Sequence, residues 1–216
     1  MPSIYSLGFG EAGCDVTLLN SHLDGIKAWK ELKFKVNTSK SKSLSKMPFR
    51  DNSFDFVWNF NTISQYKNYD EILDEFIRVS KKYVCLLAVN GFNVGSPLHR
   101  ILHVINDVNW THGDRLFLYP FAVKNLMKKH KLKIVKVGVM NCPIWPDSVG
   151  FRDMKFHKIE DKIKNMKWKS NTIDYVKNNS YPWWFKHMYS FEKMPMVWPV
   201  KLLYAHLFYV VGEKQE

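Results

Sequence analysis

The apolar residues of this chain fall into unbroken runs and into helically spaced sets, and residues 54–89 contain the clearest examples. Phe54 to Phe60 is a short apolar and aromatic run after the turn Pro48 to Ser53, which is typical of a buried strand. Tyr69 to Val79 has apolar residues at helical spacing, and Tyr83 to Val89 is a second unbroken apolar run. This order predicts a βαβ crossover in a parallel sheet covered on both faces.

The same two patterns predict further elements on both sides of this unit. The expected helices are residues 2–11, 24–32, 98–108, 116–130 and 155–169. The expected strands are residues 16–20, 34–37, 132–139 and 204–213. We expect a single domain over residues 1–216, in which residues 141–201 form an aromatic and basic insertion before the last strand.

A specific motif accompanies the central pattern. The chain reads Met47-Pro-Phe-x-Asp-x-Ser-Phe-Asp55, then a strand, then Ile72-Leu-x-Glu-Phe-x-Arg-Val79. This text closely resembles the type 11 family of class I S-adenosylmethionine-dependent methyltransferases, which reads Leu-Pro-Phe-x-Asp-x-Ser-Phe-Asp and then Glu-x-x-Arg-Val. The resemblance implies an α/β, Rossmann-like, doubly wound and mostly parallel sheet with an antiparallel last strand. It also implies S-adenosylmethionine as the cofactor and methyl transfer as the activity.

The amino-terminal residues do not fit the glycine-rich cofactor loop of that family. Ser6 to Gly13 contains a Gly-x-Gly, but only five residues separate Gly10 from the expected strand at Val16. A parallel crossover needs about a dozen residues or more. We therefore expect Pro2 to Glu11 to be a helix, and the fold to be amino-terminally truncated, with its first strand and glycine-rich loop before Met1.

That first strand lies in the middle of the family's sheet, so its absence would leave two apolar strand edges unpaired. Three explanations are open. The start could be wrong, a partner chain could complete the sheet, or the two flanking strands could close the gap.

The resemblance also assigns cofactor contacts by position. Asn20 corresponds to the acidic residue that holds the ribose, Ser43 to the one that holds the adenine amino group, and Leu44 and Asn59 to backbone contacts. Asn20 and Ser43 both depart from the acidic pattern, because an amide accepts hydrogen bonds without the strength that a negative charge adds. Cofactor binding by this chain is therefore an open question.

The methyl acceptor would lie beyond the fourth and fifth strands of the family's sheet, where Asn61, Tyr66, His99 and Trp110 follow in this chain. No catalytic residue is assigned, because the family has no universal base, and the acceptor is unidentified. His99, His103 and His112 are close in sequence but have no carboxylate partner at metal-ligand spacing, so we expect no metal.

Composition adds three expectations. The net charge of +12 and pI near 9.5 fit either an anionic partner, such as RNA or an acidic lipid surface, or a lysine-rich solvated surface. Three cysteines without a C-x-x-C indicate reduced thiols and a cytoplasmic protein. The tryptophans and prolines of residues 141–201 fit a cap over the substrate, an interfacial surface or plain packing.

Three functions remain in competition. The first is a methyltransferase, and the second is a non-catalytic methyltransferase-like module that serves as a partner subunit or scaffold. The third is a basic nucleic-acid-binding protein that reuses the fold.

Overall fold

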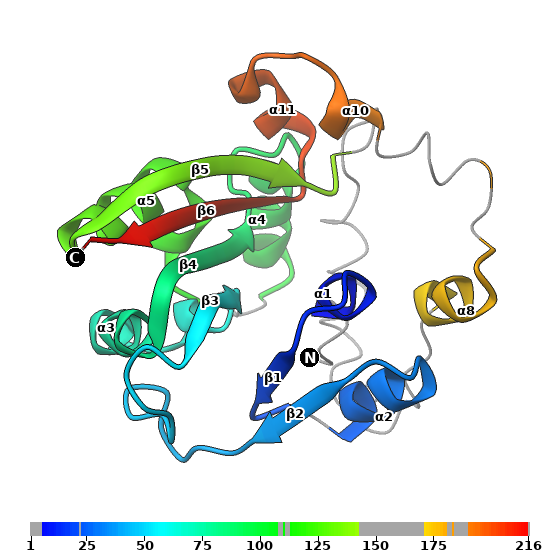
Figure 1. The fold of residues 1–216 in the computed structure, drawn as a ribbon. Coiled ribbons are helices and arrows are strands. Elements are labelled where there is room, and N and C mark those ends of the chain that lie inside the picture. Colours follow the sequence, from blue (N-terminus) through cyan, green and yellow to red (C-terminus); the bar gives the residue numbers. More distant parts are fainter. Residues whose placement is uncertain are drawn as a thin grey trace. The chain divides into compact units, whose positions relative to one another are not determined.

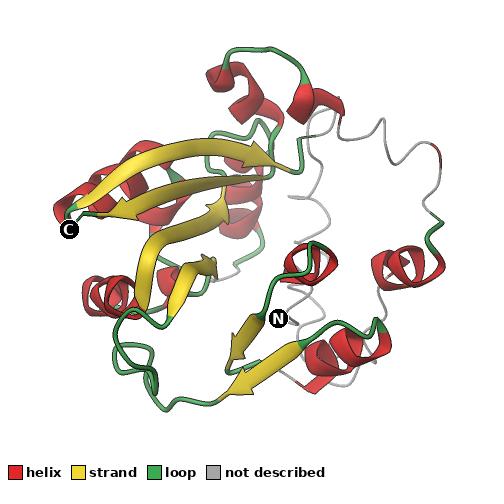
Figure 2. Ribbon diagram, in the orientation of Figure 1, coloured by secondary structure: helices red, strands yellow, loops and turns green. Residues whose placement is uncertain are grey.

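The computed structural model describes residues 6–21, 23–107, 110, 113–142, 171–180, 183 and 190–215. Contacts within the chain divide it into two compact units. The first unit comprises residues 1–48 and 166–183, and the second comprises residues 49–165 and 184–216. Each unit contains both helices and strands (Figure 2).

The first unit builds a small parallel sheet with helices. Its elements are α1 (Leu7–Glu11), β1 (Val16–Leu19), α2 (Leu23–Glu31), β2 (Val36–Ser39) and α8 (Asn171–Asn178). Strands β1 and β2 are parallel, and Val16 is opposite Val36. The core is the fully buried Trp29 with Leu7 and Leu18.

The predicted helix at the amino terminus is confirmed over Leu7–Glu11, and residues 2–5 of that prediction lie outside the described residues. Gly13 follows it with φ of 79°, a conformation that glycine adopts without strain. The amide of Cys14 donates to the carbonyl of Phe9 at 2.9 Å and closes the turn. The Gly-x-Gly of residues 8–10 is therefore part of a helix in this structure.

The strand predicted at residues 34–37 is shifted and lies at Val36–Ser39. The reason is the capping turn after α2, in which Lys33 has φ of 57° and the amide of Phe34 donates to the carbonyl of Trp29 at 3.1 Å. The Phe34 ring meets the Trp29 ring edge-on at 6.0 Å between centroids. Phe34 therefore closes the helix end before the strand begins.

The second unit contains a four-stranded mixed sheet (Figure 1). Its strands are β3 (Phe54–Phe60), β4 (Ser80–Val89), β5 (Leu132–Met140) and β6 (Leu207–Lys214), in the order β3-β4-β6-β5. Strands β3 and β4 are parallel, whereas β6 is antiparallel to both β4 and β5. The expected α/β fold with an antiparallel last strand is confirmed.

The described strands form two separate ladders, one in each unit. Strands β1 and β2 pair in the first unit, and β3, β4, β6 and β5 pair in the second. The three explanations for the expected missing strand therefore stay predictions.

Helices fill the connections of the second unit. They are η2 (Ile63–Gln65), α3 (Tyr69–Val79), α4 (Ser96–Ile105), η3 (Arg115–Leu118), α5 (Pro120–Lys129), α10 (Ser190–Lys193) and α11 (Trp198–Tyr204). The basic helix predicted at residues 155–169 lies outside the described residues. None of the described helices is long and apolar enough to cross a membrane.

Two predicted elements need correction. The single helix expected at residues 116–130 is divided into η3 and α5, because Tyr119 has an extended backbone (φ −123°, ψ 119°) before Pro120. A proline disfavours the helical conformation in the residue that precedes it. The strand expected from Tyr204 begins at Leu207, because Tyr204 is the last residue of α11.

The motif at residues 47–79 forms one network of hydrogen bonds. Arg78 at the end of α3 donates from Nε and Nη2 to the two carboxylate oxygens of Glu75, both at 2.7 Å. It also donates to the carbonyl of Phe49 at 3.0 Å and forms an ion pair with Asp51. The Arg and Glu of the motif therefore hold the turn that precedes β3 against α3.

Helices α3 and α5 lie on the same face of the sheet (Figure 1), and a histidine joins them. His130, which follows α5, has Nε2 2.7 Å from Asp70 and Nδ1 2.6 Å from Asp74. Lys129 lies 3.0 Å from the same oxygen of Asp70. The hydrogen bond with His130, followed by that with Lys129, lowers the pKa of the Asp70 carboxyl.

This clamp predicts a stability difference that depends on pH. A lowered carboxyl pKa contributes stability above the unfolded value of about 3.9, and this contribution is lost as the pH falls through the folded pKa. We expect Asp70→Asn to be less stable than the parent chain at pH 7, and the difference to disappear in acid below both pKa values. Urea unfolding at both pH values measures it, and a difference that persists unchanged in acid contradicts this origin.

Candidate functional site

The cofactor residues predicted from the sequence are divided between the units. Asn20, Ser43 and Leu44 belong to the first unit, and Asn59 belongs to the second. Asn20 directly follows β1 and has φ of 53°, a left-handed conformation that asparagine tolerates better than most residues. The backbone thus turns directly after the strand, which places the amide beside the loop that follows β2.

The Asn20 side chain already has two hydrogen bonds. Its Nδ2 donates to the carbonyl of Ser41 at 2.9 Å, and its Oδ1 accepts from the amide of Ser41 at 2.8 Å. The Asn20 amide itself donates to the carbonyl of Ser39 at 3.0 Å. Asn20 therefore ties the end of β1 to the loop after β2, a structural role that the sequence did not reveal.

Ser43 and Leu44 lie in that loop, which serine side chains hold together. The Ser41 hydroxyl donates to the carbonyl of Ser43 at 2.7 Å. The hydroxyls of Ser43 and Ser45 are 2.9 Å apart, and the amide of Ser45 donates to the Ser43 hydroxyl at 3.2 Å. Leu44 lies in the turn between them. Hydrogen bonds between serine residues therefore define the shape of this loop.

These residues fit the ribose of S-adenosylmethionine only in part. An amide oxygen has two lone pairs, and Ser41 occupies one on Asn20. One lone pair and one N–H of Asn20 therefore remain for a ribose hydroxyl. A carboxylate at this position would offer more acceptor sites and a negative charge. An amide at this position would therefore hold a ribose more weakly than a carboxylate would.

Asn59 has a structural task in the second unit. It lies near the end of β3, and its Oδ1 accepts from the amides of Thr62 and Ile63, both at 3.1 Å. The side chain thereby caps η2 and fixes the loop at the carboxyl end of the strand. Ligands bind at these strand ends in open α/β sheets.

The structure brings the predicted acceptor residues to one region of the second unit. Tyr66 and Trp110 line the same pocket of about 250 Å³, and Ser64 in that lining donates to the carbonyl of Asn61 at 2.7 Å. The His99 ring lies 6.3 Å from the Trp110 ring. The other residues of the pocket lining are Gln65, Lys67, Gly113 and Asp114.

The two histidines of α4 form a buried pair beside Trp110. The Nε2 atoms of His99 and His103 are 3.1 Å apart, and the His103 ring lies 5.4 Å from the Trp110 ring. Among the described residues, no group of three or more histidines, cysteines or carboxylates could hold a metal ion. His112, the third histidine of the sequence pattern, lies outside the described residues.

Sequence reasoning missed Gly113, Arg100 and Arg115 in this region. Gly113 has φ of 77°, and a Cβ there would lie 2.5 Å from the carbonyl oxygen of Ser64. The Trp110 indole donates to the carbonyl of Gly113 at 3.0 Å. Only a glycine permits this close approach, and the Trp-x-x-Gly spacing in the sequence was the available signal.

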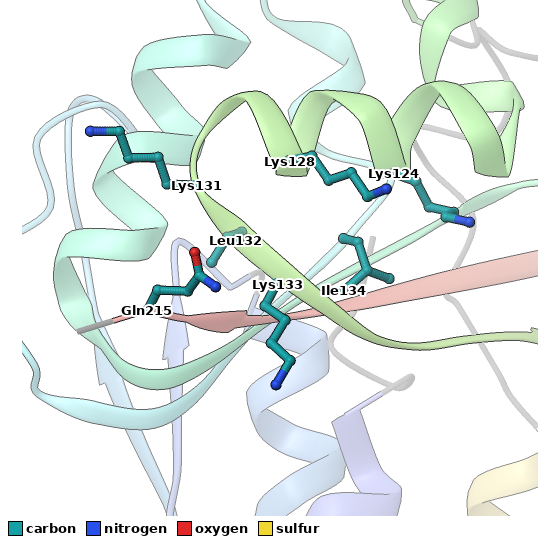
Figure 3. Close-up of a pocket in the computed structure, with 7 residues that line it drawn as sticks. All are labelled: Lys124, Lys128, Lys131, Leu132, Lys133, Ile134 and Gln215. Carbon is teal, nitrogen blue, oxygen red and sulfur yellow. The ribbon is translucent and has the colours of Figure 1, made fainter.

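A second hollow is lined by lysines whose side chains point in different directions. It has a volume of about 430 Å³ between α5 and β5, and its lining comprises Lys124, Lys128, Lys131, Leu132, Lys133, Ile134 and Gln215. Lys124 and Lys128 extend toward one side, whereas Lys131 and Lys133 point away from them and from each other (Figure 3). The amines therefore do not converge on one ion, which fits a solvated cationic face. The anionic partner stays a prediction.

Both buried cysteines are poor nucleophiles in this structure. Burial raises the pKa of the Cys85 thiol to about 12, and burial, then the nearby Glu192, raises that of Cys142 to about 11. Neither thiol is therefore available as a thiolate near neutral pH.

Comparison with known protein families agrees with the family that the motif indicates. Residues 3–87 match a family model described as a methyltransferase domain, of type 11. No curated protein matches the chain.

Similar solved structures include an S-adenosylmethionine-dependent methyltransferase from Archaeoglobus fulgidus, at 17% identity and a TM-score of 0.52, covering 97% of this chain and 80% of that one. Another from Thermotoga maritima has 13% identity and a TM-score of 0.52, covering 96% and 76%. The [4+2]-cyclase SpnF has 13% identity and a TM-score of 0.54, covering 97% and 69%. Similarity at this level of identity establishes the fold alone. SpnF is named as a cyclase, so proteins of this fold do not all have the same activity.

The motif, the mixed sheet and the match over residues 3–87 agree with one another. The resemblance expected from the sequence is confirmed as far as the comparisons reach: residues 3–87 match the type 11 methyltransferase-domain model, and the chain has the α/β fold of solved S-adenosylmethionine-dependent methyltransferases.

Proposed function

We propose that the chain binds S-adenosylmethionine and transfers its methyl group to a small-molecule acceptor held beside Trp110. The observation that carries the proposal is the family match, which spans β1 to β4 and includes the complete Arg78 network. Tyr66, His99 and Trp110 gather beyond the carboxyl ends of β3 and β4, where this fold binds ligands.

The chemistry asks little of the side chains. S-adenosylmethionine, when bound, supplies an activated methyl group. The protein contributes by orienting the acceptor and by excluding water, and such positioning alone provides a large part of a rate enhancement. Asn59 fixes the loop at the end of β3, and Tyr66 and Trp110 form aromatic walls of the acceptor pocket.

A specific observation favours a second candidate, a non-catalytic methyltransferase-like module. Asn20 stands where the family has an acidic residue that binds the ribose, and its side chain makes two hydrogen bonds with Ser41. A module that serves as a partner subunit would need the hydrophobic framework but not the ribose contact. A partner chain that completes the sheet belongs to this second proposal.

Hydrogen exchange tests the first proposal against the second. Saturating S-adenosylmethionine should slow amide exchange at residues 41–45 and 59–63, which hold the predicted backbone contacts, and methionine should not. The matched variants are Asn20→Ala, which should weaken the binding about tenfold, and Asn37→Ala, an amide on β2 that contacts Asp15 and should leave it unchanged. A folded protein without protection at residues 41–45 contradicts methyltransferase activity and favours the module.

A further inference from the structure

Two arginines flank the indole of Trp110 in the second unit. The guanidinium carbons of Arg100 and Arg115 each lie 5.9 Å from the centre of the Trp110 ring. Arg100 also lies 6.0 Å from the Tyr119 ring and donates from Nη2 to the Tyr119 hydroxyl at 2.8 Å. Arg100 comes from α4 and Arg115 begins η3, so two separate elements direct positive charge at one aromatic ring.

Within the described part of the chain, neither arginine forms an ion pair. Asp114 is adjacent to Arg115 in sequence, but its carboxylate accepts from the amide of Leu116 at 2.8 Å and caps η3. Two guanidinium groups near one ring repel each other when neither forms an ion pair, and a negatively charged ligand would relieve that repulsion.

Arg100 also has an unsatisfied hydrogen-bond donor. Its Nε is buried and has no hydrogen-bond partner among the described residues. A buried donor without an acceptor costs free energy, and more so in a charged group. Tyr119 accepts from Nη2 and therefore holds the guanidinium in a fixed orientation.

The pocket described above adjoins this cluster through Trp110. Tyr66 and Trp110 supply aromatic surface to its lining, Lys67 supplies one positive charge, Asp114 one negative charge, and Ser64 and Gln65 supply polar groups. Arg100 and Arg115 are not part of this lining and approach it at the Trp110 ring. The Tyr66 side chain is 42% exposed, so its ring is accessible. A volume of about 250 Å³ lies below the range of about 300–1,000 Å³ that drug-sized ligands occupy, and so it fits a small molecule.

We propose that the pocket beside Trp110 takes a small acceptor with a flat body and a negatively charged group, either a carboxylate or a phosphate ester. Tyr66 and Trp110 contact the flat body, and Arg100 and Arg115 recognise the charge. Arginine suits this task, because its planar fork binds carboxylate and phosphate oxygens in pairs. The identification of the ligand as a methyl acceptor rests on the function proposed above, whereas the recognition of an anion does not.

The test uses small aromatic probes without S-adenosylmethionine. Benzoate, phenyl phosphate and the neutral benzamide are titrated separately into the folded chain. Binding is followed by the NMR resonance of the Trp110 indole N–H, which donates to Gly113 and is assigned by its loss in Trp110→Phe. We expect at least one of the two anions to shift this resonance to saturation, and benzamide to bind about tenfold more weakly or not at all.

The variants locate the charge recognition. Arg115→Gln and Arg100→Gln should each weaken binding of the preferred anion about tenfold, and Arg115→Lys should retain most of the Arg115 contribution, because it keeps the charge. Two controls leave the cluster intact: Arg50→Gln, an exposed arginine in the turn before β3, and Lys128→Gln in the lysine-lined hollow. Both should bind as the parent does. Circular dichroism verifies that each variant is folded.

The outcomes separate this inference from the proposed function. If benzamide binds as well as the anions, if neither anion binds, or if only Lys128→Gln reduces the binding, recognition of an anion beside Trp110 is wrong, whatever S-adenosylmethionine does. If the anions bind as expected but S-adenosylmethionine does not, the anion site stands and methyl transfer is excluded.

Discussion

Replacement of Arg78 by methionine should destabilise the second unit by about 2–4 kcal/mol. The substitution removes both hydrogen bonds to Glu75 and leaves that carboxylate, whose side chain is only 9% exposed, without its cation. It also frees the carbonyl of Phe49 and releases Asp51. The turn that leads into β3 therefore loses its attachment to α3. Urea unfolding followed by circular dichroism measures the loss.

Two further variants identify the cause. Arg78→Lys keeps the charge but cannot reproduce the paired hydrogen bonds to Glu75, so we expect a loss of about 1–2 kcal/mol. The double variant Glu75→Leu with Arg78→Met removes the stranded carboxylate and should recover at least half of the stability lost in Arg78→Met. If the double variant is as unstable as the sum of its two single variants, the buried charge is not the cause.

Replacement of Trp29 by alanine should cost about 3–5 kcal/mol in the first unit. Trp29 is fully buried, and the core around it is small. Its buried and partly buried members are Leu7, Val16, Leu18, Leu32, Phe34 and Val36. A Cβ on Gly10 would lie 2.7 Å from the Trp29 ring, so α1 packs closely on it and cannot collapse further to fill the cavity.

The matched control is the same substitution at Trp183, which belongs to the first unit and is 78% exposed. We expect Trp183→Ala to cost less than about 1 kcal/mol, because little apolar surface is uncovered there. Hydrogen exchange at the amides of β1 and β2 measures both variants. Equal protection of these strands in Trp29→Ala and in the parent chain would contradict the role of Trp29 as the core of this unit.

The local structure of residues 54–89 could be predicted because the sequence carries two signals for it. Phe54–Phe60 is apolar at strand length, and Tyr69–Val79 has a single apolar face, so the expected elements are observed there. The division between η3 and α5 was predictable in principle from Pro120, because a proline restricts the residue before it. Periodicity alone hid that break, since apolar residues continue at helical spacing through Tyr119.

The site was less predictable, because its contacts join residues that are distant in sequence. Asn20 was identified as the residue in the ribose position, but its partner Ser41 lies 21 residues away. No local pattern specifies that pairing. Similarly, the sequence pointed to Trp110 and His99 as residues near the methyl acceptor but not to Arg100. Arg100 lies near Trp110 only because α4 packs against the segment before η3. Charged residues on a helix give no sequence signal of such an encounter.

The hydrogen bonds of Arg78 show that the motif residues have a structural role. Its Glu and Arg identify the family in sequence, yet in the structure they hold a turn rather than a ligand. The motif is therefore evidence of the fold, whereas the proposed binding of the cofactor rests on Asn20 and the loop after β2.

The most direct test is a calorimetric titration of S-adenosylmethionine, and of its demethylated product, into the folded chain. We expect saturable binding of one molecule per chain, with a dissociation constant of about micromolar order. The reason is that Asn20 can still accept one hydrogen bond from the ribose. Absence of any heat of binding, from concentrated protein that is shown to be folded, would contradict the proposal that this chain is a methyltransferase by itself.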